Sequence, residues 1–480
     1  MNKAHYWRTV CGAFLLCFAT AIGSPAQTFT TVFNFDVTDG DYPGYGSLVQ
    51  GTDGNFYGTT IYGGTSSNCT YDTYGCGTVF KITPSGTLTT LHTFCADAKC
   101  TDGYYPFAGL ILGSDGDFYG TTQSGGAHLY CGTAFKINSA GKLTTLHSFG
   151  SRETDGCGPA GALVQARNGN FYGTTESGGT NGGGTIFELT PAGKLTSLYQ
   201  FCNVCGVVPY SPTTGLVQAN NGNFYGVTEN TVFEVTPRGI LTVLHDFEDS
   251  GDGIGPVGEL ILGRNGNLYG TTAGFVGTVF EITPAGELTT LHVFCAQTDC
   301  PDGASPMGSL IQATDGNFYG TTSAGGAHPH CSGSLPKGCG TIFKITPSGT
   351  LTTLHSFHFT DGLGPLAGLT QSTDGNLYGT APYDSAAGGT AGTVFKLSTG
   401  LKPFVQTLPA FGNAGVNVTL LGTKLTGATS VKFNGTIAAF TVVSPSQITT
   451  SVPAGATTGL VQVSTPQGTI ESESAFRVTP

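Results

Sequence analysis

The stretch Asp53 to Thr60, DGNFYGTT, decides the fold because it returns six more times along the chain. The later copies are DGDFYGTT at Asp115, NGNFYGTT at Asn168, NGNFYGVT at Asn221, NGNLYGTT at Asn265, DGNFYGTT at Asp315 and DGNLYGTA at Asp374. Successive copies begin 44 to 62 residues apart. A repeat of this period predicts one supersecondary unit that is copied through the fold.

Each copy belongs to a larger unit of four segments. A segment with Pro and Gly precedes the phrase, as in PFAGLIL at Pro106, and the phrase is followed by GTVFKI at Gly77 and LTTLHTF at Leu88 or their variants. We expect these segments to be four strands, A, B, C and D. The adjacent Phe56 and Tyr57 of strand B must point to opposite faces of a sheet. Both faces should therefore be covered, and these aromatic side chains are expected to serve packing.

The Asn-Gly or Asp-Gly pair predicts a tight turn between strands A and B. A two-residue type I′ turn needs positive φ at both central residues, which Asn, Asp and Gly tolerate best. TPSG at Thr83 is expected to turn the chain between strands C and D. Such hairpins make neighbouring strands antiparallel, which argues against a parallel β-helix.

A four-stranded sheet that is covered on both faces and repeats at this period indicates a β-propeller. The seventh unit has strands at Pro365, Asp374 and Gly392 but lacks the LTTLHTF strand. A matching strand, FTTVFNF, stands at the other end of the repeat, at 29–35. We therefore expect an all-β chain whose residues 28–400 form a seven-bladed β-propeller of four-stranded blades, closed by the N-terminal strand. Closure would remove exposed sheet edges.

The unit DGNFYGTT…GTVFKITPSGTLTTLHTF resembles the GloVer repeat (Gloeo/Verruco repeat) of exported bacterial proteins, over about residues 28–400. This resemblance implies export and no particular chemistry. Residues 403–480 resemble an IPT/TIG immunoglobulin-like domain, through 415–422, 431–435 and VPAGATTG at Val452. Short alternating strands between Gly and Pro turns predict a small β-sandwich there, which we expect to be a spacer or adhesion module.

Residues 1–26 have the pattern of a signal peptide. Lys3 and Arg8 precede a short apolar stretch, and small residues follow it up to Ala26. The stretch is shorter than the roughly 20 residues that cross a bilayer, and no later run approaches that length. We expect a secreted or cell-surface protein with no membrane span in the mature chain.

The charge balance and the cysteines agree with export. The net charge is −12 and charged residues make up 10% of the chain, which argues against nucleic acid or anionic membranes as partners. Twelve cysteines follow the signal peptide, and an oxidising compartment favours their pairing. The expected pairs are Cys69–Cys76, Cys95–Cys100, Cys131–Cys157, Cys202–Cys205, Cys295–Cys300 and Cys331–Cys339. A redox or zinc role for the Cys-x-x-Cys at 202 would need a thioredoxin context or a second ligand pair.

Binding is expected on the face that carries the B–C and D–A loops, since all the length variation lies there. The longest B–C loops, 61–76 and 323–339, should wall one side of a cleft near the central channel. The candidate ligand-binding residues in these loops are Tyr62, Tyr71, Asp72, Tyr74, His128, Tyr130, His328, His330, Tyr383 and Asp384. They could act as general acids and bases, form a polar rim, or be ordinary loop residues.

Two recurrent residues are better explained by architecture. His92 and its counterparts occupy one position of strand D, so they are expected to be structural. The D–A loops repeat Asp-Gly-x-x-Pro at Asp39, Asp102, Asp155, Asp252, Asp302 and Asp361. Calcium is the cofactor that such residues suggest, but no loop gathers enough oxygens, although DFEDSGDG from Asp246 comes closest. We expect Asx turns and no cofactor.

Three functions fit the sequence. The first is a non-catalytic binding or adhesion module for an extracellular glycan or surface protein, acting as a monomer. The second is a polysaccharide lyase or glycoside hydrolase with its site on the B–C/D–A loop face, which rests on fold analogy and requires His128, His328 or His330 to converge with an acidic or Tyr partner. The third is a purely structural surface protein, which predicts no pocket.

Overall fold

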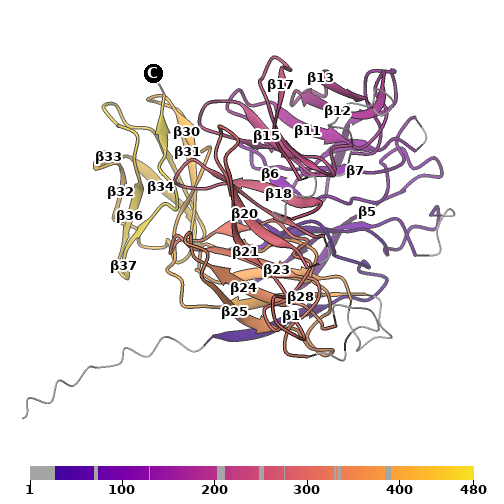
Figure 1. Ribbon diagram of the computed structural model, residues 1–480. Coiled ribbons are helices and arrows are strands. Elements are labelled where there is room, and N and C mark those ends of the chain that lie inside the picture. The colour runs from indigo at the N-terminus through magenta and orange to yellow at the C-terminus, as the bar shows by residue number, and fades with distance from the viewer. Residues whose placement is uncertain are drawn as a thin grey trace, which may run out of the picture.

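The computed structural model describes residues 27–69, 74–128, 130–159, 161–202, 211–247, 253–274, 276–328, 331, 337–383 and 391–479. Within these ranges every regular element is a β-strand, so the all-β prediction is confirmed (Figure 1). The described part of the chain contains no helix long and apolar enough to cross a bilayer.

Seven four-stranded sheets occupy residues 28–398 of this described chain, and each holds one copy of the repeat. Sheet 1 consists of β2 (Val49–Gln50), β3 (Phe56–Thr60), β4 (Thr78–Ile82) and β5 (Leu88–Thr93). Sheet 2 consists of β6 (Ile111–Leu112), β7 (Phe118–Thr122), β8 (Thr133–Ile137) and β9 (Leu143–Ser148). Sheet 3 consists of β10 (Val164–Gln165), β11 (Phe171–Thr175), β12 (Gly182–Leu189) and β13 (Leu195–Cys202).

The remaining four sheets repeat the same antiparallel order. Sheet 4 consists of β14 (Val217–Gln218), β15 (Phe224–Val227), β16 (Thr231–Val235) and β17 (Leu241–Asp246). Sheet 5 consists of β18 (Pro256–Leu262), β19 (Leu268–Thr272), β20 (Thr278–Ile282) and β21 (Leu288–Val293). Sheet 6 consists of β22 (Ile311–Gln312), β23 (Phe318–Thr322), β24 (Thr341–Ile345) and β25 (Leu351–Ser356). Sheet 7 consists of β26 (Thr370–Gln371), β27 (Leu377–Ala381), β28 (Thr393–Ser398) and the N-terminal β1 (Thr28–Asn34).

The N-terminal strand completes the last sheet, as predicted. β1 runs antiparallel to β28, with Thr28 opposite Ser398 and Asn34 opposite Thr393. The chain then carries the buried Phe35 to within 5.1 Å of the Phe80 ring in sheet 1. One short segment therefore joins the two ends of the row of sheets.

Glutamines at the ends of the first strands make further hydrogen bonds between neighbouring sheets. The side-chain oxygens of Gln165, Gln218, Gln312 and Gln371 each accept a hydrogen bond from a backbone N–H of the preceding sheet, at 2.8–3.2 Å. Gln50 accepts one from Thr373 at 3.0 Å, which connects sheet 7 to sheet 1. Since the last sheet bonds to the first, the seven sheets form a ring with their first strands around its centre.

The second strand of each sheet is buried on both faces, as its adjacent aromatic residues predicted. In β3 every residue is buried, and Phe56 and Tyr57 have no exposed surface. The Tyr57 ring stacks on Phe118 of sheet 2 at 3.9 Å. A side chain at Gly58 would lie 2.6 Å from the Phe80 ring, so only glycine fits there. The phrase FYGTT is thus a packing unit between neighbouring sheets.

The turn that joins the first two strands differs from the predicted type I′ turn. Gly54 has φ 81°, but Asp53 is not among the residues with positive φ. The Gly54 N–H donates to the Gly51 carbonyl at 2.9 Å, and the Gly51 N–H donates to the Asn55 carbonyl at 2.8 Å. This is a type I turn followed by a left-handed glycine. Asp53 is selected because its Oδ1 accepts the Asn55 N–H at 3.1 Å.

The choice between Asp and Asn in this turn depends on the residue across the sheet. In sheet 2 the Tyr119 hydroxyl donates to Asp115, and Lys136 lies 3.3 Å from the same carboxylate. In sheet 3 Asn168 stands in place of the aspartate, and Glu188 stands in place of the lysine. Sheets 1, 6 and 7 have the Asp and Lys pair, whereas sheets 4 and 5 have the Asn and Glu pair. In every sheet the turn residue and the residue across the sheet are thus a complementary pair, either Asp with Lys or Asn with Glu.

Exchanging one residue of such a pair should destabilise the sheet, and exchanging both residues should restore its stability. Glu188 accepts hydrogen bonds from Asn168 at 3.2 Å and Tyr172 at 2.8 Å. Asn168→Asp places two carboxylates together, so we expect a loss of about 1 kcal/mol in the free energy of unfolding at pH 7. Adding Glu188→Lys should recover most of it in urea unfolding. The coupling would be contradicted if the double variant lost as much free energy of unfolding as the two single variants lose together.

The recurrent histidine of the fourth strand is structural, as predicted, and it explains the recurrent aspartate. The His Nε2 atoms lie 2.8–3.4 Å from an aspartate Oδ2 in the following loop, in the pairs His92–Asp102, His147–Asp155, His292–Asp302 and His355–Asp361. Although burial opposes the shift, the hydrogen bond with His292 lowers the pKa of Asp302. The predicted Asx turns are therefore replaced by ties between the loop and its own sheet. Asp252 lies outside the described residues.

The C-terminal residues form a separate pair of sheets with their own core. One sheet consists of β29 (Gln406–Leu408), β31 (Asn417–Leu421), β35 (Gln447–Ser451) and β34 (Phe440–Ser444). The other consists of β33 (Thr436–Ala438), β32 (Ser430–Phe433), β36 (Val461–Thr465) and β37 (Gly468–Glu471), and a parallel pair is made by β30 (Phe411–Gly412) and β38 (Arg477–Val478). Buried aliphatic side chains and the Phe433–Phe476 pair fill the space between them.

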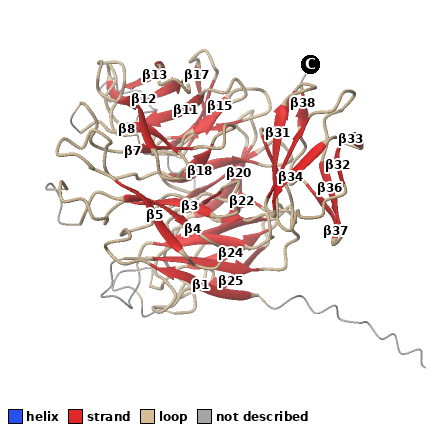
Figure 2. Ribbon diagram, turned by 180° about the vertical axis from the view of Figure 1, so that it is seen from behind, coloured by secondary structure: helices blue, strands red, loops and turns tan. Residues whose placement is uncertain are grey.

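This C-terminal domain lies on the side of the ring that carries the tight turns (Figures 1 and 2). The Ser446 hydroxyl donates to the Thr52 carbonyl at 3.0 Å, and the Phe404 N–H donates to the Thr373 carbonyl at 3.1 Å. Arg264 lies 3.8 Å from Glu473. These contacts reach turns of sheets 1, 5 and 7, so the domain covers this side of the ring and leaves the variable loops on the other side.

Candidate functional site

A cavity of about 500 Å³ occupies the centre of the ring. Residues of the first strands and of the segments before them line it, together with Tyr45 and Phe107 at the end nearest the variable loops. Gln406 and Leu408 of β29 line the opposite end. The C-terminal domain therefore covers one end of the cavity, while Tyr45, 37% exposed, marks the end that faces solvent.

Eight aromatic residues gather at this solvent-facing end and form what we name the tyrosine cluster. Its members are Tyr42, Tyr45, Tyr62, Tyr74, Tyr104, Tyr105, Phe107 and Tyr383. They come from loops of sheets 7, 1 and 2, which are neighbours in the ring. Each ring centroid lies 4.3–6.1 Å from at least one other in the cluster. The eight rings thus form one continuous network of contacts rather than a set of separate side chains.

The outer members of the tyrosine cluster are exposed, and the inner ones hold them in place. Tyr74 is 59% exposed and Tyr383 41%, whereas Tyr104 is buried. The Tyr383 hydroxyl donates to the Tyr42 hydroxyl at 3.1 Å, and Tyr45 stacks on Phe107 at 4.3 Å. Burial, followed by the hydrogen bond with Tyr383, raises the pKa of Tyr42 well above its usual range. The Tyr42 hydroxyl is therefore neutral at physiological pH.

Two members of the cluster have strained backbones. Tyr42 and Tyr105 have φ of 62° and 57°, in the left-handed region that bulky residues avoid. Each directly precedes the proline that leads into the first strand of its sheet. The matching residue is Gly158, Gly255 or Gly364 in sheets 3, 5 and 7, and Ser211 or Ser305 in sheets 4 and 6, always with positive φ. Tyrosine stands where glycine would cost less, and such strain concentrates at functional sites.

A nearly buried carboxyl lies beside the cluster. Asp41 directly precedes Tyr42 and pairs through its backbone with Tyr62, at 2.8 and 2.9 Å. Its Oδ1 has no hydrogen-bond partner among the described residues, and burial raises the pKa of Asp41 to about 6. Asp41 does not line the central cavity. Its titration therefore falls close to neutral pH.

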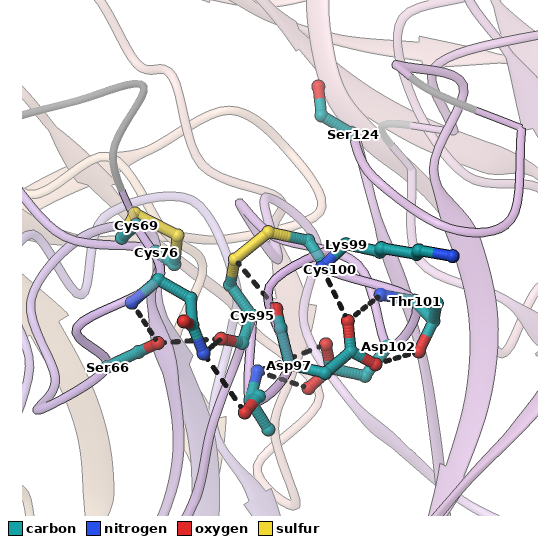
Figure 3. The surroundings of a disulfide bond; sticks show 12 residues. Ser66, Cys69, Cys76, Cys95, Asp97, Lys99, Cys100, Thr101, Asp102 and Ser124 are labelled. Carbon is teal, nitrogen blue, oxygen red and sulfur yellow. Dashed lines mark hydrogen bonds between the residues drawn. A yellow bond between two sulfur atoms is a disulfide. The ribbon is translucent and has the colours of Figure 1, made fainter.

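Disulfides fix the loops around the tyrosine cluster. The structure joins five of the expected pairs, Cys69–Cys76, Cys95–Cys100, Cys131–Cys157, Cys295–Cys300 and Cys331–Cys339. Cys202 is also disulfide-bonded, while Cys205 lies outside the described residues. Figure 3 shows the Ser66 hydroxyl beside the Cys95–Cys100 bridge, where it donates to the Cys95 carbonyl at 2.6 Å. The long loop of sheet 1 is thereby held against the next loop of the same sheet.

The predicted site residues separate into two groups. Tyr62, Tyr74 and Tyr383 belong to the tyrosine cluster. His128 is exposed and acts electrostatically on His147 of the outermost strand β9, and Tyr130 is exposed in the same loop. The His328 ring lies 5.0 Å from His358, which follows the outermost strand β25. The histidines thus lie by the outer strands of two different sheets, and none of them lines the cavity. Tyr71, Asp72, His330 and Asp384 lie outside the described residues.

The sequence interpretation missed the inner members of the cluster. Tyr42, Tyr45, Tyr104, Tyr105 and Phe107 precede or begin the first strands, which looked like spacers between repeats. One signal was available, because tyrosine replaces the usual glycine or serine before the proline in sheets 1 and 2. Among the described residues, no three His, Cys, Asp or Glu side chains gather as metal ligands.

A family model described as the Gloeobacter/Verrucomicrobia repeat matches residues 69–273 and 231–442. The chain belongs to this repeat family. Comparison with curated proteins gives no match.

Solved structures resemble the chain at low sequence identity. A streptogramin B lyase structure has a TM-score of 0.52 and 16% identity, and covers 78% of this chain and 97% of its own. A virginiamycin B lyase from Staphylococcus aureus has a TM-score of 0.51 and 14% identity, and covers 78% and 99%. The extracellular domain of a protein described as a one component system from B. thetaiotaomicron has a TM-score of 0.50 and 11% identity, and covers 95% and 58%. At these identities the likeness shows the fold alone, a repeat β-propeller.

Proposed function

We propose that this protein is an exported, non-catalytic β-propeller that binds an extracellular glycan on its tyrosine cluster. The observation that carries the proposal is the continuous cluster of eight aromatic rings, whose outer members are exposed, at the open end of the central cavity. Aromatic rings offer flat apolar faces for the C–H groups of sugar rings, and tyrosine hydroxyls add hydrogen bonds at their edges. The strained Tyr42 and Tyr105 and the disulfides around them preorganise the surface, which lowers the entropy lost on binding.

The net charge of the protein limits the class of glycan that it can bind. With a net charge of −12, the chain repels uronic acid polymers and sulfated glycans. Neutral polysaccharides therefore fit the surface best. A surface protein is the other kind of ligand that such a cluster can take, since tyrosine is enriched at protein interfaces as well.

The finer architecture is part of the same proposal. Each of the seven sheets is one blade of the propeller, and residues 403–480 are an IPT/TIG immunoglobulin-like domain that acts as a spacer. Residues 1–26 are the signal peptide, and disulfides in the loops agree with an oxidising destination at the cell surface or outside the cell. The mature chain acts as a monomer.

Asp41 favours a second candidate, a polysaccharide lyase or glycoside hydrolase. Its pKa of about 6 suits a general acid or base, and tyrosines lie next to it. Two features favour binding over catalysis. Asp41 is 5% exposed and does not line the cavity, and His128 and His328 lie by outer strands rather than in the cavity.

The test uses residues 27–480, which contain no tryptophan because the only one is Trp7. Tyrosine fluorescence can therefore be followed without a tryptophan background, and seven of the 18 tyrosines in these residues belong to the cluster. We would titrate neutral plant and microbial oligosaccharides, with uronic acid oligomers as the charged control, and assay new reducing ends and unsaturated products. Saturable quenching without product supports the proposal. Product that disappears in Asp41→Asn would establish the enzyme instead, and no effect from any glycan would reject both.

A further inference from the structure

One position of the central cavity breaks the repeat. The residue before the first buried leucine of each sheet is small in six sheets, namely Ser47, Gly109, Ala162, Gly215, Ser309 and Gly368. In sheet 5 it is Glu259. The small residues let neighbouring first strands approach closely, as at Gly46, where a side chain would lie 2.7 Å from Gly109. A carboxyl has thus been placed at a position where the close approach of neighbouring strands favours small side chains.

The fold uses this carboxyl as an acceptor for two backbone groups. Glu259 Oε1 accepts the Ala162 N–H at 2.9 Å, and the Gly215 N–H also donates to this carboxylate. Glu259 also lines the cavity. Burial raises the pKa of Glu259 in spite of both donors. A purely structural tie would need only an acceptor, which glutamine supplies without a charge.

A second carboxyl lines the same cavity. Glu176 follows β11, and Gln123 donates to its Oε2 at 3.3 Å. Burial raises the pKa of Glu176 despite that hydrogen bond. Among the described residues that line the cavity there is no Lys, Arg or His. The two acids therefore share a cavity without a cation to pair with.

The rest of the cavity is mainly apolar. Leu48, Ile111, Val257, Met307 and Leu366 contribute to its walls. The stacked pair of Tyr45 and Phe107 lies at the solvent-facing end. Aromatic faces attract cations, and carboxylates pair with them, so acids and aromatics in an apolar cavity complement an ammonium group with an apolar body.

We propose that the central cavity is a binding site for a small organic amine, whose ammonium group pairs with Glu259 and Glu176 and whose apolar body fills the space between the first strands. A volume of about 500 Å³ suits a small molecule, and it excludes a polysaccharide chain. The site is distinct from the glycan surface, although Tyr45 and Phe107 border both. Amine binding can therefore fail or succeed independently of the glycan proposal.

Such binding should release protons. In the empty cavity burial favours the protonated carboxyls, so their pKa values are raised. An ammonium group favours the ionised forms and lowers these pKa values again. The affinity should therefore increase as pH rises from about 5 to 8, where the amine itself stays protonated, and level off once both acids are ionised in the empty protein.

The test compares 2-phenylethylamine with 2-phenylethanol, which has nearly the same body and no charge. Calorimetric titration of residues 27–480 at pH 5, 6, 7 and 8 should show at least about tenfold tighter binding of the amine at pH 8 than at pH 5. The alcohol should bind weakly and independently of pH. Glu259→Gln keeps an acceptor for the Ala162 N–H, and it should lose about tenfold in amine affinity together with most of the pH dependence. Glu287→Gln, an exposed turn residue of the same sheet, should behave as the wild type.

Four results would overturn this proposal. Equal affinities for amine and alcohol would make the cavity an apolar pocket, and a flat pH profile would exclude the carboxyls. Unchanged amine binding in a Glu259→Gln variant with a normal thermal transition would make Glu259 a structural tie. Absence of any binding by the amine, with oligosaccharide quenching intact, would reject the cavity site and leave the tyrosine cluster unaffected.

Discussion

Tyr105→Gly is expected to remove most of the glycan affinity while leaving the protein folded. Tyr105 connects Tyr62 with Tyr104 in the tyrosine cluster, at centroid distances of 5.5 and 4.7 Å. Truncating a central aromatic residue of a binding surface typically costs about 2 kcal/mol or more, which corresponds to roughly a 30-fold loss of affinity. Its φ of 57° is one that glycine adopts without strain. The relief of strain should offset part of the lost packing, so the free energy of unfolding should fall by about 1 kcal/mol or less.

The matched control is Ser305→Gly. Ser305 has φ 53° and precedes the corresponding proline in sheet 6, outside the cluster. The same backbone change there should leave glycan affinity unaltered and slightly raise the melting temperature. Tyrosine fluorescence titration and thermal unfolding of both variants separate the two roles. If Tyr105→Gly bound glycan like the wild type, the cluster would be packing and the proposed function would lose its support.

The repeat predicts the fold because every copy packs against its two neighbouring sheets in the same way. Phe56 and Tyr57 each face a neighbouring sheet, and their alternation indicates a sheet covered on both sides before any coordinates are known. The missing strand of sheet 7 and its match at the N-terminus predicted the closure that β1 and β28 make. Local chemistry was less predictable. Asp53 was read as a residue with positive φ, but its side chain stabilises a type I turn, and composition alone does not separate these two uses.

The candidate site was predicted only to the level of a face. Loop lengths indicated that sheets 6, 7, 1 and 2 would wall one side, with the longest loops in sheets 1 and 6. The tyrosine cluster is built from sheets 7, 1 and 2, and sheet 6 contributes none of its members. The residues that build it, such as Tyr42 and Tyr105, carry a functional signal only by comparison with the same position in other sheets. Glu259 also stands out only in such a comparison. A glutamate is not unusual by itself, but the six equivalent residues of the other sheets are small. His128 and His328 were predicted as polar residues of the loop face, and the structure places them by the outer strands of sheets 2 and 6.

Phe35→Ala is expected to cause the largest loss of stability of any single change considered. Phe35 is 1% exposed, and its ring lies 5.1 Å from Phe80 in sheet 1. Its N–H donates to the Gly392 carbonyl at 3.0 Å, beside β28 of sheet 7. Removing a buried phenylalanine costs about 3–5 kcal/mol in a core that cannot collapse around the cavity. Here the cavity also opens at the junction that closes the ring, so the loss should fall at the upper end of that range in urea unfolding.

Phe149→Ala separates the loss of packing from the loss of closure. Phe149 occupies the same position in sheet 2, is fully buried, and meets Phe187 at 5.1 Å, as Phe35 meets Phe80. The strand before Phe149 is joined by a tight turn to its own sheet, whereas no turn joins β1 to sheet 7, where it pairs with β28 and packs through Phe29. Both variants should lose similar packing energy, but only Phe35→Ala should free β1 and expose the edge of β28. We therefore expect concentration-dependent aggregation below the unfolding transition in Phe35→Ala and not in Phe149→Ala, measured by light scattering. Equal behaviour of the two variants would mean that the N-terminal strand adds packing but does not secure the ring.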